Sequence, residues 1–208
     1  MSPKSRTTFF SLLILFVVTT ALVVFHGISA PFDQGVDVFL YHTRTPLLVH
    51  LFSLITFLGS GSVIIVFAVL IAIGLWFSRY RRFLTGFLVT LVGAEATSYI
   101  LKILIARPRP LAPLPLTIDP SFSYPSGHAT AAMALYGFLI YLIYRMPLSE
   151  GRKKLFVTLL VLLILLIGFS RLYLGMHFPT DVIGGYLVSL LWIMIGASLY
   201  RKIKTRTF

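Results

Sequence analysis

Six runs of apolar residues are the feature that most limits what this chain can fold into. A helix needs about 20 mainly apolar residues to cross the hydrocarbon core of a bilayer, and every run approaches or exceeds that length. The mean hydropathy of +0.94 and the charged fraction of 12% also lie outside the range of ordinary soluble domains. We therefore predict an all-α, polytopic membrane protein, a bundle of six transmembrane helices at about residues 8–28, 47–77, 83–106, 127–145, 155–171 and 180–200.

One membrane domain over residues 1–208 accounts for the chain, because the sequence shows no internal repeat and no low-complexity tract. The chain has no cysteine, which excludes a disulfide framework and a thiolate metal site. The net charge of +12 could indicate a nucleic-acid partner, but the basic residues fall in short clusters between the apolar runs. We therefore expect the bilayer, and no nucleic acid, as the partner. The sequence gives no indication of an oligomeric state.

Most of the basic residues mark one side of the predicted bundle. Thirteen of the 18 Lys and Arg residues precede the first run, follow the last, or lie in the connectors after the second and fourth runs. Positively charged connectors are typical of the cytoplasmic side, so we predict that both termini are cytoplasmic. Alternatively, the first run is a signal peptide cleaved after residues 28–30, which leaves the orientation of the other five runs unchanged. The thirteen residues are Lys4, Arg6, Arg79, Arg81, Arg82, Arg145, Arg152, Lys153, Lys154, Arg201, Lys202, Lys204 and Arg206.

A second group of charged residues is predicted to gather on the opposite, extracytoplasmic side. It contains the other five basic residues, with two histidines and an aspartate at the starts of the fourth and sixth runs. A basic residue at the centre of a span costs about 2.5–3.5 kcal/mol, so a function should compensate for it. Each residue alone could be a snorkelling side chain or an interfacial anchor, but their joint clustering favours a functional site. The group is Arg44, Lys102, Arg107, Arg109, Arg171, His128, His177 and Asp181.

This combination of cations and histidines predicts a pocket for an anion. Planar guanidinium groups bind phosphate well, through paired hydrogen bonds. The spacing of His177 and Asp181 could suit a metal ion. However, Lys102, Arg109 and Arg171 would repel a divalent cation. We therefore predict phosphoryl transfer that needs no metal and no other cofactor.

The stretch SYPSGHAT, residues 123–130, places polar residues at the start of the fourth run. Pro125 starts a turn, Ser126 is a natural N-cap, and Gly127 lets the backbone approach a ligand closely. The helix that follows directs free N–H groups and the positive end of its dipole toward the pocket. His128 could give a proton to the leaving oxygen of a bound phosphate ester. An isolated histidine here would instead be explained by a hydrogen bond at the interface.

The second histidine lies in RLYLGMHFPTDVIGG, residues 171–185. Because proline disfavours helix before it, the sixth helix should start at Pro179 or Thr180, which leaves His177 just outside it. Asp181 falls in the first turn, where it could accept a hydrogen bond from one ring nitrogen of His177. The other ring nitrogen is then available as a nucleophile.

Three motifs resemble the signature of the type-2 phosphatidic acid phosphatases, a superfamily that includes the vanadium haloperoxidases. The resemblance covers about residues 45–200 and is greatest to small bacterial members, which act on phosphatidylglycerol phosphate, phosphatidic acid or polyprenyl diphosphates such as undecaprenyl diphosphate. It implies a lipid phosphatase of the plasma membrane, with its active site on the extracytoplasmic side. The motifs are Lys102, six residues, then Arg109-Pro110; Pro125-Ser126-Gly127-His128; and Ser170-Arg171, five residues, His177, three residues, then Asp181.

The resemblance also implies a role for each motif residue. His177 would attack phosphorus to form a phosphohistidine, and Asp181 would orient its ring. His128 would protonate the leaving group and later activate water. The phosphoryl oxygens would be held by Lys102, Arg109, Arg171, Ser126 and the Gly127 amide.

Two further residues are candidates without a motif role. Spacing from Lys102 selects Arg109 over Arg107 for the motif, so Arg107 is left to contact the headgroup, the rim of the pocket or a catalytic side chain. Glu95 lies two helical turns before Lys102, on nearly the same face of the helix. Glu95 either contacts Lys102 or a headgroup, or keeps its proton in a hydrogen bond between helices.

The sequence leaves other functions open. A phosphotransferase of the same family would pass the phosphoryl group to an acceptor other than water, and a binder would hold lipid phosphate without hydrolysis. A transporter could use Glu95 and Lys102 as an anion path, although the chain lacks paired, broken apolar segments. The proline-rich loop at residues 107–125 could cap the pocket or contact the headgroup.

Overall fold

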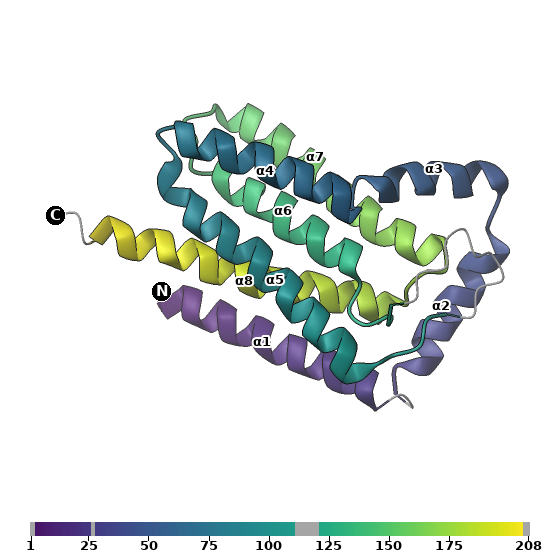
Figure 1. Cartoon of the computed structure of the whole chain (residues 1–208). Helices are drawn as coiled ribbons and strands as arrows, with labels where there is room; N and C mark the ends of the chain where they lie inside the picture. The colour runs from purple at the N-terminus through teal and green to yellow at the C-terminus, as the bar shows by residue number, and fades with distance from the viewer. Residues whose placement is uncertain (1–2, 26–27, 111–120, 206–208) are drawn as a thin grey trace.

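The computed structural model describes residues 3–25, 28–110 and 121–205, and within these ranges it is helical with no strand (Figure 1). The all-α prediction is therefore confirmed. Arg206 and most of the proline-rich loop, residues 111–120, lie outside the described residues. The helices are α1 (Pro3–Val24), α2 (Ala30–His42), α3 (Pro46–Phe57), α4 (Gly61–Phe77), α5 (Leu84–Ile105), α6 (Gly127–Ile143), α7 (Glu150–Tyr173) and α8 (Pro179–Thr205), with a 3₁₀ turn, η1, at Arg81–Phe83.

Most of these helices are long and apolar enough to cross a membrane. Five stretches of the described chain meet that criterion: α1, α3 with α4, η1 with α5, α7, and Pro179–Leu199 of α8. At 17 residues, α6 is a shorter apolar helix. The chain is thus a multi-pass membrane protein, whereas the count of six spans and the side of each terminus remain predictions.

The centre of the bundle is α6, which packs against α5, α7 and α8. Small side chains along α6, including the fully buried Ala132 and Ala134, allow these neighbours to approach closely. Larger side chains then fill the spaces between helices, with Phe87 of α5, Phe138 of α6 and Ile167 of α7 completely buried in one cluster. This packing holds the N-terminus of α6 among the ends of its neighbours.

The tightest helix crossing is between α5 and α8. A Cβ atom added at Gly86 would lie 2.5 Å from the carbonyl oxygen of Gly196, and one added at Gly196 would lie 2.3 Å from the carbonyl oxygen of Gly86. Thr90 donates a hydrogen bond to the Trp192 carbonyl oxygen at 3.2 Å in the same region. The two backbones therefore touch directly, which only residues without a side chain permit.

The structure differs from the sequence prediction in two places. Residues 30–42 form the helix α2, where only a connector was expected. The predicted second span is two helices, because the chain leaves helical geometry between Phe57 and Gly61. As Figure 1 shows, α3 and α2 extend from the same end of the bundle as the start of α8.

Candidate active site

Segments far apart in the sequence meet at one end of the bundle. The end of α5, the start of α6, the end of α7 and the start of α8 all lie there (Figure 1). Backbone hydrogen bonds join them, from Ser123 N–H to the Arg107 carbonyl at 2.9 Å and from Ser126 N–H to the Asp181 carbonyl at 3.0 Å. The predicted gathering of the motif segments at one end is therefore what the fold produces.

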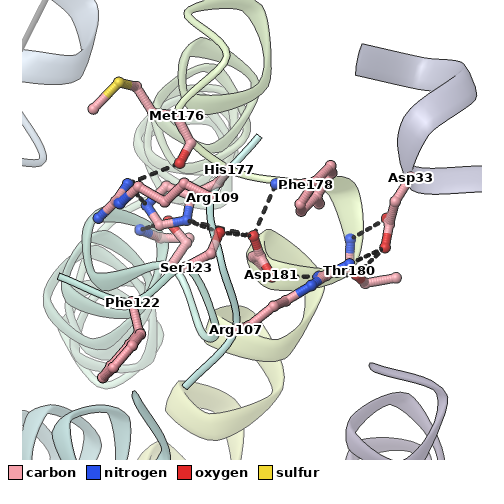
Figure 2. Close-up of polar contacts among 12 residues, drawn as sticks. Asp33, Arg107, Arg109, Phe122, Ser123, Met176, His177, Phe178, Thr180 and Asp181 are labelled. Carbon is pink, nitrogen blue, oxygen red and sulfur yellow. Dashed lines mark hydrogen bonds and ion pairs between the residues drawn. The ribbon is translucent and has the colours of Figure 1, made fainter. Parts of the chain in front are cut away.

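The imidazole of His177 is buried between a carboxylate and a guanidinium (Figure 2). Its Nδ1 atom lies 3.5 Å from Oδ2 of Asp181, and its Nε2 atom lies 3.3 Å from Nη1 of Arg109. Because a guanidinium has donors and no acceptor, Nε2 must be the ring nitrogen with the lone pair. The ring proton of neutral His177 then sits on Nδ1, facing Asp181.

Ser123 belongs to the same cluster, and the sequence analysis missed it. Its hydroxyl donates to Oδ2 of Asp181, and its oxygen lies 3.4 Å from Nδ1 of His177. The Phe178 N–H donates to the same Oδ2 atom at 2.8 Å. Ser123 opens the SYPSGHAT stretch, so its position two residues before Pro125 was the available signal.

His177 is held in its neutral form. Burial lowers the pKa of His177 to about 4, and the positive charges of Arg171 and Arg109 act in the same direction. The hydrogen bond and negative charge of Asp181 only partly oppose this shift. A neutral ring with its lone pair at Nε2 is the form that can attack phosphorus.

Two of the predicted cations form hydrogen bonds with the segment that carries Ser123. Arg109 donates to the Ser121 carbonyl at 2.8 Å, to the Ser121 hydroxyl at 2.9 Å and to the Met176 carbonyl at 2.8 Å. Lys102 donates from Nζ to the Phe122 carbonyl at 2.6 Å. Backbone carbonyl groups therefore hold both cations, and Arg109 is held beside the imidazole.

The start of α6 has the geometry that the sequence predicts. Ser126 is the N-cap, and its side chain accepts a hydrogen bond from Ala129 N–H at 3.5 Å. A Cβ atom added at Gly127 would meet nothing within 4 Å, so there is open space in front of the first turn. The positive end of the α6 dipole can therefore receive an anion in this space.

His128 and Arg171 both lie at the break between α3 and α4. Arg171 donates from Nη1 to the Thr56 hydroxyl at 3.0 Å. His128 is half-buried in the first turn of α6, with Cδ2 3.5 Å from the position a Cβ would take at Gly59. The break between α3 and α4 therefore contributes residues that contact two motif residues.

The two candidates without a motif role lie in different surroundings. Arg107 is buried, and its guanidinium contacts Asp181, while its suggested contact with a headgroup remains a prediction. Glu95 lies on an exposed face of α5, and its suggested role remains a prediction.

A cavity of about 550 Å³ opens beside Arg107 and Arg109 on the side of α2. Within residues 3–25, 28–110 and 121–205, no group of three His, Asp or Glu side chains is arranged to hold a metal ion.

Comparison with known proteins identifies the family. A sequence profile of the PAP2 superfamily matches residues 83–205. Phosphatidylglycerophosphatase B of Bacillus subtilis (strain 168) is 33% identical and covers 93% of this chain and 95% of its own length. Undecaprenyl-diphosphatase BcrC of the same strain is 27% identical, over 72% of this chain and 73% of its own.

A solved structure shares the fold along nearly the whole chain. The transmembrane PAP2-type phosphatidylglycerolphosphate phosphatase from Bacillus subtilis superposes with a TM-score of 0.84 at 29% identity, covering 94% of this chain and 96% of its own. The profile match contains every residue of the three motifs, from Lys102 to Asp181. This chain therefore belongs to the PAP2 superfamily, as a multi-pass membrane lipid phosphatase.

Proposed function

We propose that the chain hydrolyses a phosphate monoester of a membrane lipid through a phosphohistidine at His177. The observation that carries this proposal is the position of the imidazole, with Nε2 beside Arg109 and Nδ1 beside Asp181. A phosphoryl oxygen bound by Arg109 would lie next to the nucleophilic nitrogen. Asp181 would then stabilise the positive charge that the ring gains on attack.

In the first step, Nε2 of His177 attacks phosphorus. The new bond is N–P, and the bond that breaks joins phosphorus to the oxygen of the lipid alcohol. His128 gives its proton to that oxygen, so the lipid leaves as a neutral alcohol. The phosphoryl group remains on the protein as phosphohistidine.

In the second step, water attacks the phosphohistidine. His128, now neutral, takes a proton from the water as its oxygen bonds to phosphorus. The N–P bond breaks, inorganic phosphate leaves, and both histidines return to their starting states. His128 thus loses one proton in the first step and regains one in the second, so the protons balance over the cycle.

The cations of the site supply the charge that phosphoryl transfer needs. Lys102, Arg109 and Arg171 carry three positive charges, and the start of α6 adds N–H donors in front of Gly127. A dianionic phosphate is attracted by this arrangement, whereas a divalent metal ion is repelled. The proposed reaction therefore proceeds without a metal.

Phosphatidylglycerol phosphate is the substrate that the comparisons favour. The Bacillus subtilis relative and the solved Bacillus subtilis structure, which each match over more than nine-tenths of this chain, are named for activity on that lipid. The relative named for undecaprenyl diphosphate matches a smaller part of the chain. We also propose that the site faces the extracytoplasmic side of the plasma membrane, because the basic connectors lie at the other end of the helices.

The experiment measures phosphate release in detergent from phosphatidylglycerol phosphate, phosphatidic acid and undecaprenyl diphosphate. We expect His177→Ala to abolish release and a chelator to leave it unchanged. Radiolabelled phosphate from the lipid should become covalently attached to wild-type protein in an acid-labile form, and not to His177→Ala. Full activity of His177→Ala refutes the assigned nucleophile, and label that appears in a second lipid shows a phosphotransferase instead.

A further inference from the structure

The helix α2 carries a buried carboxylate that connects to the active site. Asp33 of α2 is completely buried, and its Oδ2 atom lies 2.6 Å from Nη2 of Arg107. Arg107 uses its other terminal nitrogen, Nη1, to donate to Oδ1 of Asp181 at 2.6 Å. A single guanidinium therefore bridges the two carboxylates, as Figure 2 shows.

Thr180 closes this arrangement into a network. Its backbone N–H donates to Oδ1 of Asp33 at 3.2 Å, and its hydroxyl donates to Oδ2 of Asp33 at 2.7 Å. The same hydroxyl oxygen accepts a hydrogen bond from Nη1 of Arg107 at 2.8 Å. Asp33 thus fixes both the guanidinium and the backbone immediately before Asp181.

The network determines which oxygen of Asp181 faces the nucleophile. Arg107 occupies Oδ1, while Ser123 and the Phe178 N–H donate to Oδ2 beside the His177 ring. The ring of Phe178 also packs against the Arg107 guanidinium, with 4.4 Å between its centre and the guanidinium carbon. Rotation of the Asp181 carboxylate would break the contact with Arg107.

Charge adds to this geometric role. Two carboxylates share one guanidinium, and the exposed fractions of the Arg107, Asp33 and Asp181 side chains are 5%, 1% and 0%. A buried network with an excess of negative charge stabilises positive charge on the adjacent imidazole. The proposed attack on phosphorus creates positive charge there.

We propose that Asp33 and Arg107 are positioning residues, which hold the Asp181 carboxylate against His177 and make α2 part of the catalytic apparatus. Asp33 lies before all three motifs in the sequence, so the motifs do not assign this role to it. The inference rests on the proposed function of His177 as the nucleophile.

The test compares Asp33→Asn with Asp37→Asn. Asp37 is one turn further along α2, and the ion pair recorded for it is with Arg44 at 3.7 Å. We expect Asp33→Asn to lower kcat about 10- to 100-fold, the size usual for residues that orient a reacting group, with little change in KM. Asp37→Asn should retain wild-type kcat.

A second measurement separates positioning from folding. In protein labelled with ¹⁵N-histidine, wild-type His177 should show one tautomer, with its proton on Nδ1. Asp33→Asn should give a mixture of tautomers, while Asp37→Asn should give the wild-type spectrum. If Asp33→Asn does not fold, Thr180→Val removes the bridging hydroxyl at nearly constant volume and should change kcat and the spectrum in the same direction.

The outcomes distinguish this inference from the proposed function. An active His177→Ala variant overturns the proposed function and the inference with it. An inactive His177→Ala, together with an Asp33→Asn variant that matches Asp37→Asn in kcat and in the His177 spectrum, overturns the inference alone. A loss of kcat in Asp33→Asn with an unchanged tautomer also contradicts it.

Discussion

The Nε2 atom of His177 lies 3.3 Å from a guanidinium nitrogen of Arg109. Arg109 is itself held by the carbonyl groups of Ser121 and Met176, so it approaches the ring from a fixed direction. This contact orients the lone pair of the proposed nucleophile toward the group that would bind phosphate. The positive charge of Arg109 also opposes protonation of the ring.

His177 should remain neutral far below the pH at which a solvent-exposed histidine titrates. Burial and two nearby cations lower its pKa to about 4, compared with about 6.5 for an exposed histidine. Between these values the unfolded chain binds one more proton at this residue than the folded chain does. The free energy of unfolding should therefore rise as pH increases from about 4 to about 6.5, and this contribution is lost as pH falls through that range.

Carbon-13 spectra of histidine-labelled protein can measure this pKa. The resonance that disappears in His177→Gln identifies His177. It should keep the chemical shift of a neutral ring from pH 8 to pH 5.5. A titration midpoint near 6.5 would contradict the buried, cation-flanked environment.

Ser123→Ala should reduce activity more than stability. It removes a hydrogen bond that holds the Asp181 carboxylate beside the His177 ring, so we expect kcat to fall about 10- to 100-fold, which corresponds to about 1.4–2.7 kcal/mol of transition-state stabilisation. Ser189→Ala is the matched control, because Ser189 is equally buried and its hydroxyl bonds to the Thr130 carbonyl at 2.7 Å. Thermal unfolding and phosphate release are measured for both variants. Equal kcat values would show that Ser123 has no catalytic role.

Gly127→Ala should separate phosphate binding from folding. A Cβ atom there meets nothing within 4 Å, and alanine is favoured over glycine in a helix by about 1 kcal/mol. The variant should be as stable as wild type or slightly more so. Its methyl group would occupy the open space where the phosphate is proposed to bind, so KM should rise. An unchanged KM and unchanged inhibition by inorganic phosphate would place the phosphate elsewhere.

Ala106→Gly should stabilise the protein. Ala106 ends α5 with a φ angle of 48°, in the left-handed region that costs a residue with a Cβ about 1 kcal/mol. Its side chain is exposed, so little packing is lost. Urea or thermal unfolding should show a gain of up to about 1 kcal/mol. A loss of stability would mean that the Ala106 methyl group contributes packing that offsets the strain.

Cysteine labelling should determine which side the site faces. The chain has no cysteine, so a single introduced cysteine gives an unambiguous signal. Two exposed positions suit this test: His42 in α2, at the same end of the bundle as the site, and Gly151 at the start of α7, at the other end. In intact cells a membrane-impermeant maleimide should label His42→Cys and leave Gly151→Cys unlabelled until the membrane is opened. The reverse pattern would place the site on the cytoplasmic side.

The sequence was sufficient to predict the long apolar helices and the gathering of the motif segments at one end of the bundle. Ser126 caps α6 and α8 begins at Pro179, as the local signals of a cap residue and a proline indicate. These features depend on residues next to one another in the chain. They can be read without knowledge of the tertiary structure.

Features that depend on contacts between distant segments were not predicted. Residues 30–42 contain too many polar residues for a span, and a helix there is stabilised by burial of Asp33 against Arg107 and Thr180. Its local signals, Pro31 in the first turn and Asp33 two residues later, are short and weak. The break between α3 and α4 coincides with the glycines and serines of GSGS, residues 59–62, which a hydropathy average hides.

The glycine crossing of α5 and α8 has a consequence at the far end of both helices. Lys102 lies 16 residues beyond Gly86, a distance of about 24 Å along the α5 axis. A methyl group at Gly86 or Gly196 would force the axes apart, and a tilt of about 5° about that point would displace Lys102 by about 2 Å. The position of Lys102 relative to the reacting phosphorus therefore depends on Gly86 and Gly196, which lie near the opposite membrane surface. Substitutions at these glycines can yield protein that folds but is inactive.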